Sequence, residues 1–318
     1  MHRHLTFAAL RALSTAFIAA ASPAHAETIT VCLDGSCDFT TPGAAVEAAA
    51  AGDTIEIAAG TYLFSAPINT FGKNLVIRGA VGADGRPVTV FDGQNSTTLL
   101  GFWFVSELTQ VENIVLANGH AEYASALRVD SSSGITFRNC VLRDNRSQFA
   151  GAMMIFSASA TMIGCEVVDN VGSHPGQSAG AGIRVSSGTL TLIDSAVTGN
   201  AATYIGGGIF LSSQGIVKLD SSRVCGNTAP NGPQIGMNPG GTVTDLGGAC
   251  VMGNCDDCPV SPACPGDLDG NGFVDGTDLG ALLAAWGPCA ACLADINGDG
   301  VVNGLDLGAM LGSWGACR

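Results

Sequence analysis

The stretch that decides the fold is Ser195–Asn227, SAVTGNAATYIGGGIFLSSQGIVKLDSSRVCGN, which holds one period of an internal repeat. The pattern that opens it, a serine followed by a valine two positions on and an asparagine five positions on, returns at Ser222. Between the two copies, Ile209 and Leu211 are apolar residues spaced two apart. This alternation predicts strands with one buried face, and the recurrence predicts that the same face returns in each repeat.

The repeat extends well beyond this stretch. Asparagines recur at intervals of 27, 25, 30 and 27 residues, at Asn118, Asn145, Asn170, Asn200 and Asn227. The residue three positions earlier is always apolar: Val115, Leu142, Val167, Val197 and Val224. A second strand with inward pairs follows the asparagine at Leu127/Val129, Met153/Ile155, Ile183/Val185 and Ile209/Leu211. The pattern predicts a mainly β chain with a right-handed parallel β-helix over residues 52–249, whose turns bury their apolar faces against one another. A β-sandwich is the alternative, but its strands would not hold one register through five copies.

The asparagine at each repeat predicts a ladder of stacked amides, since Asn tolerates the left-handed conformation that tight turns need. Ahead of the coil, residues 27–51 are expected to form a cap. Thr41-Pro42 marks the start of a short helix there, with Ala45, Val46 and Ala49 as its apolar stripe.

Two resemblances support this fold. The segment GDTIEIAAGTY at Gly52–Tyr62 resembles the first coil of pectate-lyase-like (pectin-lyase-like) β-helix proteins. The GN…GGGI pattern is similar to repeats of polymorphic outer-membrane proteins. The resemblance covers about residues 50–240 and implies a fold, not a chemistry.

The end of the chain contains a second repeat, DLDGNGFVDGTD from Asp267 and DINGDGVVNGLD from Asp295. Oxygen donors stand at positions 1, 3, 5, 9 and 12, the backbone carbonyl of position 7 adds another, and Gly272 and Gly300 fill the turn at position 6. This is the spacing of an EF-hand-type Ca²⁺ loop, so the sequence predicts two bound Ca²⁺ ions. The expected ligands are Asp267, Asp269, Asn271, Phe273, Asp275 and Asp278 in the first loop, and Asp295, Asn297, Asp299, Val301, Asn303 and Asp306 in the second.

A helical apolar pattern follows each loop, at Leu279, Leu282, Leu283 and Trp286 and at Leu307, Met310, Leu311 and Trp314. Two loop–helix units without entering helices resemble the dockerin type I module, over residues 264–318. That resemblance implies a small all-α, pseudo-twofold calcium domain that docks on a cohesin-like or cell-surface partner. The chain departs from the family at its recognition surface, where loop positions 10 and 11 are Gly276-Thr277 and Gly304-Leu305 and the helices contain no Lys or Arg.

The N-terminus indicates secretion. Arg3 and Arg11 precede or flank a short apolar run, and Ala24-His25-Ala26 is a small-x-small cleavage site, so residues 1–26 are expected to be a signal peptide. The protein is then extracellular or on the cell surface, and no later apolar stretch is long enough for membrane insertion. Residues 1–26 contain two of the 13 basic residues and none of the 27 acidic ones, so the net charge after cleavage is −16. This charge argues against nucleic acid as a partner.

All 12 cysteines follow residue 26, and their even number predicts disulfides in an oxidising compartment. The candidates are Cys32, Cys37, Cys255, Cys258, Cys264, Cys289, Cys292 and Cys317. In the tail, a helix of about 15 Å separates the two cysteines of each repeat, which excludes a disulfide within a repeat. The dockerin resemblance implies a pseudo-twofold module in which the start of one repeat meets the end of the other, so we expect the pairs Cys264–Cys317 and Cys289–Cys292. Cys225 is expected to pair within the Cys/Pro-rich linker 250–263, with Cys250 as one option. Cys140 and Cys165 share an inward column and are expected to be buried thiols.

One outward column reads Arg128, Met154, Arg184, Phe210. The two arginines, about 10 Å apart, could bind the carboxylates of a uronate chain. Phe210 could stack on a sugar, or it and Met154 could be exposed without a role or lie under a loop.

No catalytic set is identified. Hydrolysis needs two carboxylates across a glycosidic bond, but Asp194 and Asp220 are one residue out of register, and Glu166 and Asp169 show no partner. Arg184 or Lys218 as a lyase base has no supporting pattern. Two functions stay open: a secreted calcium-binding β-helix protein that binds extracellular polysaccharide or acts as a scaffold through its tail, and a polysaccharide lyase or glycoside hydrolase.

Overall fold

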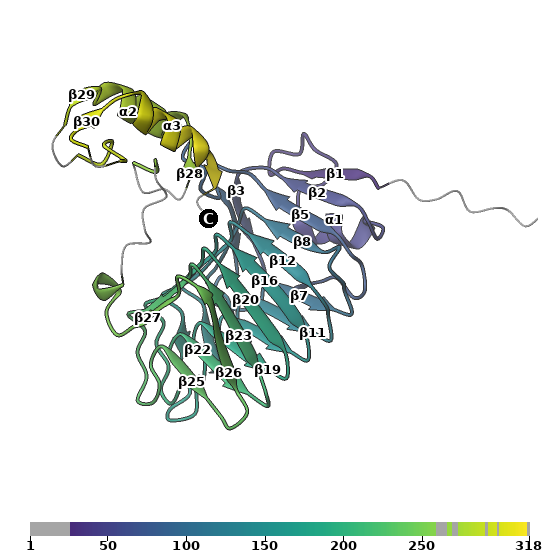
Figure 1. Ribbon diagram of the computed structural model, residues 1–318. Coiled ribbons are helices and arrows are strands. Elements are labelled where there is room, and N and C mark those ends of the chain that lie inside the picture. Colours follow the sequence, from purple (N-terminus) through teal and green to yellow (C-terminus); the bar gives the residue numbers. More distant parts are fainter. Residues whose placement is uncertain (1–25, 259–265, 269–272, 290–291, 298, 317–318) are drawn as a thin grey trace, which may run out of the picture.

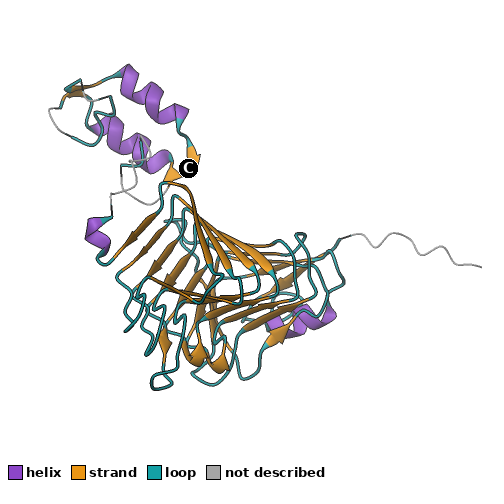
Figure 2. Ribbon diagram, turned by 60° about the horizontal axis from the view of Figure 1, so that its bottom comes forward, coloured by secondary structure: helices purple, strands orange, loops and turns teal. Residues whose placement is uncertain are grey.

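The computed structural model describes residues 26–258, 266–268, 273–289, 292–297 and 299–316. The larger part is a parallel β-helix in which each strand pairs with the equivalent strand one turn later along the axis (Figure 1). Strands are the main regular structure in the described residues, and the helices are few and short (Figure 2). No described helix is both long enough and apolar enough to span a membrane.

Three long sheets and one short one form the coil. The first sheet contains β1 (Thr28–Val31), β2 (Thr54–Ile57), β5 (Val76–Gly79), β8 (Gln110–Glu112), β12 (Ile135–Arg138), β16 (Ser159–Ile163), β20 (Thr189–Ile193), β23 (Ile216–Asp220) and β26 (Thr242–Gly247). The second contains β3 (Gly60–Leu63), β6 (Thr89–Asp92), β9 (Ile114–Ala117), β13 (Val141–Arg143), β17 (Glu166–Val168), β21 (Ala196–Thr198), β24 (Arg223–Cys225) and β27 (Cys250–Met252). The third contains β4 (Ile68–Asn69), β7 (Leu100–Trp103), β11 (Leu127–Asp130), β15 (Met153–Phe156), β19 (Ile183–Ser186), β22 (Ile209–Ser212) and β25 (Ile235–Met237). The short fourth sheet contains β10 (His120–Tyr123), β14 (Arg146–Ala150) and β18 (Val171–Gly172).

The core consists of columns of apolar side chains that recur once per turn. In the first sheet one column reads Ile55, Ile77, Val111, Phe137, Met162, Leu192 and Leu219, each at most 1% exposed. The inward pairs predicted for the third sheet, from Leu127/Val129 to Ile209/Leu211, are all fully buried. The predicted parallel β-helix is therefore confirmed.

The register corrects the first copy of the repeat by one residue. Leu142 pairs with Leu116 rather than Val115, so Gly119 and not Asn118 occupies the position of Asn145. Asn118 instead matches Asp144, and both have a positive φ. The residue with the left-handed conformation is thus the one immediately before the position of Asn145. The asparagines at that position therefore do not themselves adopt the left-handed conformation.

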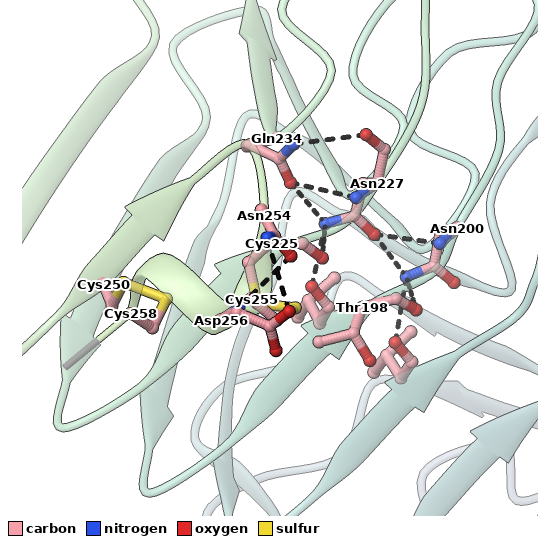
Figure 3. The surroundings of a disulfide bond; sticks show 12 residues. Thr198, Asn200, Cys225, Asn227, Gln234, Cys250, Asn254, Cys255, Asp256 and Cys258 are labelled. Atoms are coloured by element: carbon pink, nitrogen blue, oxygen red, sulfur yellow. Dashed lines mark hydrogen bonds between the residues drawn. A yellow bond between two sulfur atoms is a disulfide. The ribbon is translucent and has the colours of Figure 1, made fainter. Parts of the chain in front are cut away.

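The ladder is formed by the other four asparagines. Asn145 donates its backbone N–H (3.0 Å) and its amide Nδ2 (2.9 Å) to Oδ1 of Asn170. Asn170 repeats this geometry to Asn200, and Asn200 to Asn227. Gln234 ends the ladder by accepting both N–H groups of Asn227 on Oε1 (Figure 3). These side chains are buried, and their hydrogen bonds join each turn to the next.

The two ends of the coil are closed differently. At the start, α1 (Pro42–Ala48) is N-capped by Thr41 and buries Ala45 and Val46, as predicted, and it packs against β1, β2 and β4. Since β1 pairs with β2, the first sheet begins within the predicted cap. At the other end a single 3₁₀ turn, η1 (Cys255–Asp257), is tied to the last turns by two disulfides (Figure 3).

The described disulfides can be compared with the pairs predicted from the sequence. The described bonds are Cys32–Cys37, Cys225–Cys255, Cys250–Cys258 and Cys289–Cys292. Cys225 does pair within the linker, but the suggested partner Cys250 was wrong, because η1 covers the outer face of β24 and brings Cys255 to it. Cys140 and Cys165 are buried free thiols, as expected. Cys264 and Cys317 lie outside the described residues.

The C-terminal repeats each contain one described helix, α2 (Gly276–Ala284) and α3 (Gly304–Gly312). β28 (Phe273–Val274) of the first repeat pairs with β31 (Gly315–Ala316) of the second, and β29 (Gly287–Pro288) pairs with β30 (Val301–Val302). The start of each repeat therefore meets the end of the other. The helices are shorter than the apolar pattern suggests. Leu283 and Trp286 are about half exposed, and the core is Val274, Leu282, Ala294, Val302 and Met310. Nine-residue helices present only one narrow face inward.

Candidate functional site

Two neighbouring columns of side chains lie on the outward side of the third sheet. We call these two columns together the outer face. The first column reads Asn69, Gly101, Arg128, Met154, Arg184 and Phe210. The second reads Trp103, Asp130, Phe156, Ser186 and Ser212. Phe71 extends the second column, because the N–H of Gly72 donates to the carbonyl of Trp103. The structure thus brings Arg128, Arg184 and Phe210 together in one column, as the sequence predicted.

Arg184 is a half-buried cation on the outer face. Its guanidinium lies 5.4 Å from the centre of the Phe210 ring, and its Nε donates to Ser186 Oγ at 3.4 Å. Within the described part of the chain no carboxylate forms an ion pair with it. Burial lowers the pKa of the Arg184 guanidinium, and nearby Tyr123 partly opposes that shift. A charge held in this way favours an anion from outside the chain.

Arg128 is differently placed, two turns earlier in the column. Its Nη2 forms an ion pair with Asp130 at 2.8 Å, and its guanidinium lies 5.9 Å from the centre of the Trp103 ring. Its Nε is buried and makes no hydrogen bond within the described residues. Arg128 is therefore partly neutralised and oriented along the face, whereas Arg184 is not.

Phe210 is only 4% exposed. Its ring lies against the Arg184 guanidinium. Of the interpretations given to it above, direct stacking on a sugar does not fit this position. Phe210 instead supports the guanidinium from one side, as cation–π contacts do.

Exposed aromatic side chains lie at the start and in the middle of the second column of the outer face. Phe71 stacks on Trp103 with ring centres 5.2 Å apart and is 66% exposed, and Phe156 is 42% exposed. The Trp103 ring lies over Gly101, where an added Cβ would meet it at 1.9 Å. Gly101 is thus what allows the indole to lie flat against the sheet. Flat, exposed aromatic rings are surfaces on which sugar rings can stack.

A second aromatic row follows the fourth sheet. Tyr123, Phe149 and His174 come from three successive turns and stack with ring centres 5.5 Å and 4.4 Å apart. These residues, and Trp103 and Phe71, were not predicted from the sequence. Trp103 could have been found by extending the third-sheet pairs one turn back from Leu127/Val129 to Leu100/Phe102, which places Trp103 in the column of Asp130.

The acidic candidates lie elsewhere, on the first sheet. Asp220 pairs in register with Ile193, so Asp194 is one residue off, as predicted, although its N–H donates to the carbonyl of Asp220 at 3.1 Å. Burial raises the pKa of Asp194, and the charge of Asp220 raises it further. Lys218 is also on the first sheet, away from Arg184, and Glu166 lies on the second sheet. Asp169 follows β17 in the left-handed conformation.

The second predicted calcium loop, residues 295–306, is described except for residue 298. The position-1 carboxylate of Asp295 accepts N–H groups from Asp299 (3.1 Å) and Gly300 (2.7 Å), which folds the loop around it. Gly300 has φ +87°, as position 6 requires. The position-12 carboxylate of Asp306 accepts from Asn303 and Asn297, forming a capping box with α3. The Asn303 N–H contributes most to lowering the pKa of Asp306, against the effect of burial.

The first loop has the same capping arrangement, with Asp278 accepting from Asp275 and Leu268. Asp269 and Asn271 lie outside the described residues. In the described part of the chain no three His, Cys, Asp or Glu side chains are gathered in a metal-binding cluster. The donor types fit a hard cation, because all are carboxylate, amide or carbonyl oxygens. Residues 264–318 contain seven carboxylates and a single basic residue, Arg318.

The sequence matches no protein-family profile, and no curated protein is significantly similar to it. Among solved structures, pectate lyase Pel9A is similar with a TM-score of 0.41 and 15% identity, over 63% of each chain. Pectin methylesterase from Aspergillus niger, in two glycosylation states, gives TM-scores of 0.31 and 0.32 at 14% and 11% identity, over 73% and 74% of this chain and 86% and 87% of that one. The chain spans less than two thirds of the length of the pectate lyase. At these TM-scores the similarity decides nothing about activity, and the fold rests on the strand register described above.

Proposed function

We propose that this protein binds an acidic polysaccharide, such as a polyuronate, along the outer face of the third sheet. The observation that carries the proposal is Arg184, a half-buried guanidinium without a carboxylate partner in the described residues. An uncompensated charge of this kind costs free energy, and a uronate carboxylate would offset that cost. The exposed rings of Phe71 and Phe156 supply the apolar contacts that sugar rings need.

The spacing of the face suits an extended chain. Successive turns are about 4.8 Å apart, close to the length of one pyranose unit, so one sugar would lie over each turn. Arg128 and Arg184 are two turns apart. They would therefore contact alternate sugar units.

The test is a binding measurement with matched variants. The change Arg128→Met with Arg184→Met keeps the apolar stems and removes both charges. We expect loss of binding to polygalacturonate in calorimetry. Arg184→Met alone should not lower the thermal stability, because Arg184 forms no ion pair in the described residues, whereas Arg128→Met removes the ion-pair partner of Asp130 and should lower it. Arg86→Met, on an exposed loop, is the control and should bind as wild type. Unchanged affinity in the double variant would refute the proposal.

A second candidate function is polysaccharide hydrolysis, favoured by the raised pKa of Asp194 beside Asp220. A carboxyl group with a raised pKa beside a second carboxyl group is an arrangement that general acid catalysis uses. This site lies on the first sheet and is independent of the outer face. Release of reducing ends from a panel of uronate and neutral polysaccharides, abolished by Asp194→Asn, would establish it; a chain that binds glycan without releasing new ends is a binding protein.

For the tail we propose two Ca²⁺ ions and a role in attachment. Asp306 is a fully buried carboxylate, and the described residues of this part of the chain contain no Lys, Arg or His. Bound Ca²⁺ would supply the missing positive charge. Leu283, Trp286, Leu311 and Trp314 are each about half exposed and provide an apolar surface for a cohesin-like or cell-surface partner. Pull-down with immobilised cohesin, with and without Ca²⁺, tests that partner.

A further inference from the structure

A pocket of about 600 Å³ lies at the start of the coil, between α1 and the loop that leads from β3 to β4. Its walls are polar and apolar in about equal measure, and Val46, Phe64 and Pro67 are among the apolar residues. The volume and the mixed lining suit a small ligand that has both apolar and polar groups.

A buried hydroxyl without a hydrogen bond belongs to this pocket. Thr70 is 1% exposed and lines the pocket, and its Oγ1 makes no hydrogen bond within the described residues. The Oδ1 of its neighbour Asn69 is also unsatisfied, but it lies over Gly101 on the outer face. Buried hydroxyl groups are nearly always hydrogen-bonded, so the unsatisfied hydroxyl of Thr70 favours a polar ligand in the pocket.

The same loop joins the pocket to the outer face. Asn69 stands in the column of Arg128 and Arg184, and Phe71 stacks on Trp103 while also lining the pocket. Phe71 has φ +36°, an unfavourable conformation for a bulky residue, and two thirds of its side chain is exposed, so packing does not explain it.

The outer face ends at the pocket. α1 packs against β1, β2 and β4 at this end of the coil (Figure 1). A chain that follows the third sheet toward α1 therefore reaches the pocket rather than open surface.

We propose that this pocket binds the terminal sugar of the polysaccharide that lies on the outer face, so that the protein recognises a chain end. The inference rests on the proposed function. A pyranose presents apolar C–H faces to Phe64 and Pro67, and one of its hydroxyls exchanges a hydrogen bond with Thr70 Oγ1. Phe71 forms the shared wall between the last sugar on the face and the terminal one.

The experiment measures affinity for a short galacturonate oligosaccharide, intact or carrying a bulky group at one end or the other. We expect one of the two blocked forms to bind about tenfold more weakly than the intact oligosaccharide, and the other to bind normally. Ala66→Trp, at the exposed rim, should fill the pocket and weaken the intact oligosaccharide to a similar degree. Ala83→Trp, on an exposed loop away from the pocket, is the matched control.

Thr70→Val supplies a variant that tests the hydroxyl without adding bulk. It should weaken the oligosaccharide by about threefold to tenfold, the value of one hydrogen bond, and should not lower the melting temperature, because the hydroxyl has no partner in the protein. If Arg128→Met/Arg184→Met abolishes binding while both blocked forms, Ala66→Trp and Thr70→Val bind normally, the pocket proposal is overturned and the function stands. If the wild-type chain binds no uronate, both are overturned.

Discussion

At the scale of single residues, the asparagine ladder shows how one side chain serves two turns. Each Oδ1 accepts two N–H groups from the turn before it, at 2.9 to 3.0 Å from Asn145 to Asn227. All of these groups are buried. Removing one amide therefore leaves donors of the neighbouring turn without a partner.

Asn170→Ala should lower the free energy of unfolding by about 2–4 kcal/mol, because the backbone N–H and Nδ2 of Asn145 lose their acceptor. Chemical denaturation measures this. Asn118→Gly is the control: Asn118 has the positive φ that glycine accepts and lies outside the ladder, so we expect little change. Equal losses in the two variants would contradict the corrected register.

Asp194 gives a pH-dependent prediction. Its pKa is raised in the folded state, so its ionised form is less stable there than in the unfolded chain, and it lowers stability once the pH rises above that pKa. Asp194→Asn keeps the shape and tolerates the positive φ. At pH 7 the substitution should raise the melting temperature slightly. The gain in the free energy of unfolding should be less than about 1 kcal/mol, because the Asp194 carboxyl is partly solvated.

The gain from Asp194→Asn should fade as the pH falls toward 3.5, where the carboxyl is protonated in both states. Melting curves of the two proteins at several pH values measure the difference. A gain that stays constant with pH would show that Asp194 does not titrate as described.

The sequence predicted individual residues well where a period repeats and less well where it is interrupted. The inward pairs of the third sheet and the buried thiols followed directly from their columns. The first copy was one residue out because Asn118 matches the asparagine pattern, while the ladder position holds Gly119, which bears no amide. Phe210 was placed in its column correctly, but its burial depends on Arg184 packing over it, which no periodicity encodes.

At the scale of elements, the end of the coil is held by cross-links rather than by a large cap. The Cys225–Cys255 bond closes a loop of sequence separation 30 and holds η1 over β24. Cys250–Cys258 fixes the other side of the same turn. The sequence indicated disulfides here, but the pairing depends on how η1 folds back and could not be read from spacing.

Cys225→Ser combined with Cys255→Ser should destabilise the last turns by about 3–4 kcal/mol on the chain-entropy model. Hydrogen exchange should show faster exchange in β24 and β27, with β2 and β5 unchanged as an internal control. The same pair of substitutions at Cys32 and Cys37 should affect the opposite end instead. Uniform exchange after the first change would argue against a local role.

The C-terminal loops are elements whose stability we expect to depend on metal. With Asp306 buried and no cation nearby in the described residues, Ca²⁺ binding should become folding free energy. Calorimetry on the full chain should show two Ca²⁺ ions bound, and Asp267→Ala with Asp295→Ala should remove both. Asp84→Ala, on an exposed loop, is the control. Absence of heat, together with unchanged fluorescence of Trp286 and Trp314, would refute calcium binding.

At the scale of the whole molecule, the β-helix places one set of outward side chains on each turn, at a regular spacing along its axis. The fold could be predicted because the period, the inward columns and the turn residues all repeat. The candidate site could be predicted only in part, since Arg128 and Arg184 lie in a repeating column, whereas Phe71 belongs to the irregular first turn. The pocket beneath α1 depends on how the cap packs, and sequence alone does not show it.

The most direct test of the central claim, that acidic polysaccharide lies along the outer face, is hydroxyl-radical footprinting of the full chain with and without polygalacturonate. Mass spectrometry would report the oxidation of each aromatic side chain. We expect protection of Phe71, Trp103 and Phe156, with exposed Leu246 on β26 and the tail residues Trp286 and Trp314 oxidised as before. Unchanged oxidation of Phe71, Trp103 and Phe156 in the presence of bound polysaccharide would contradict the account.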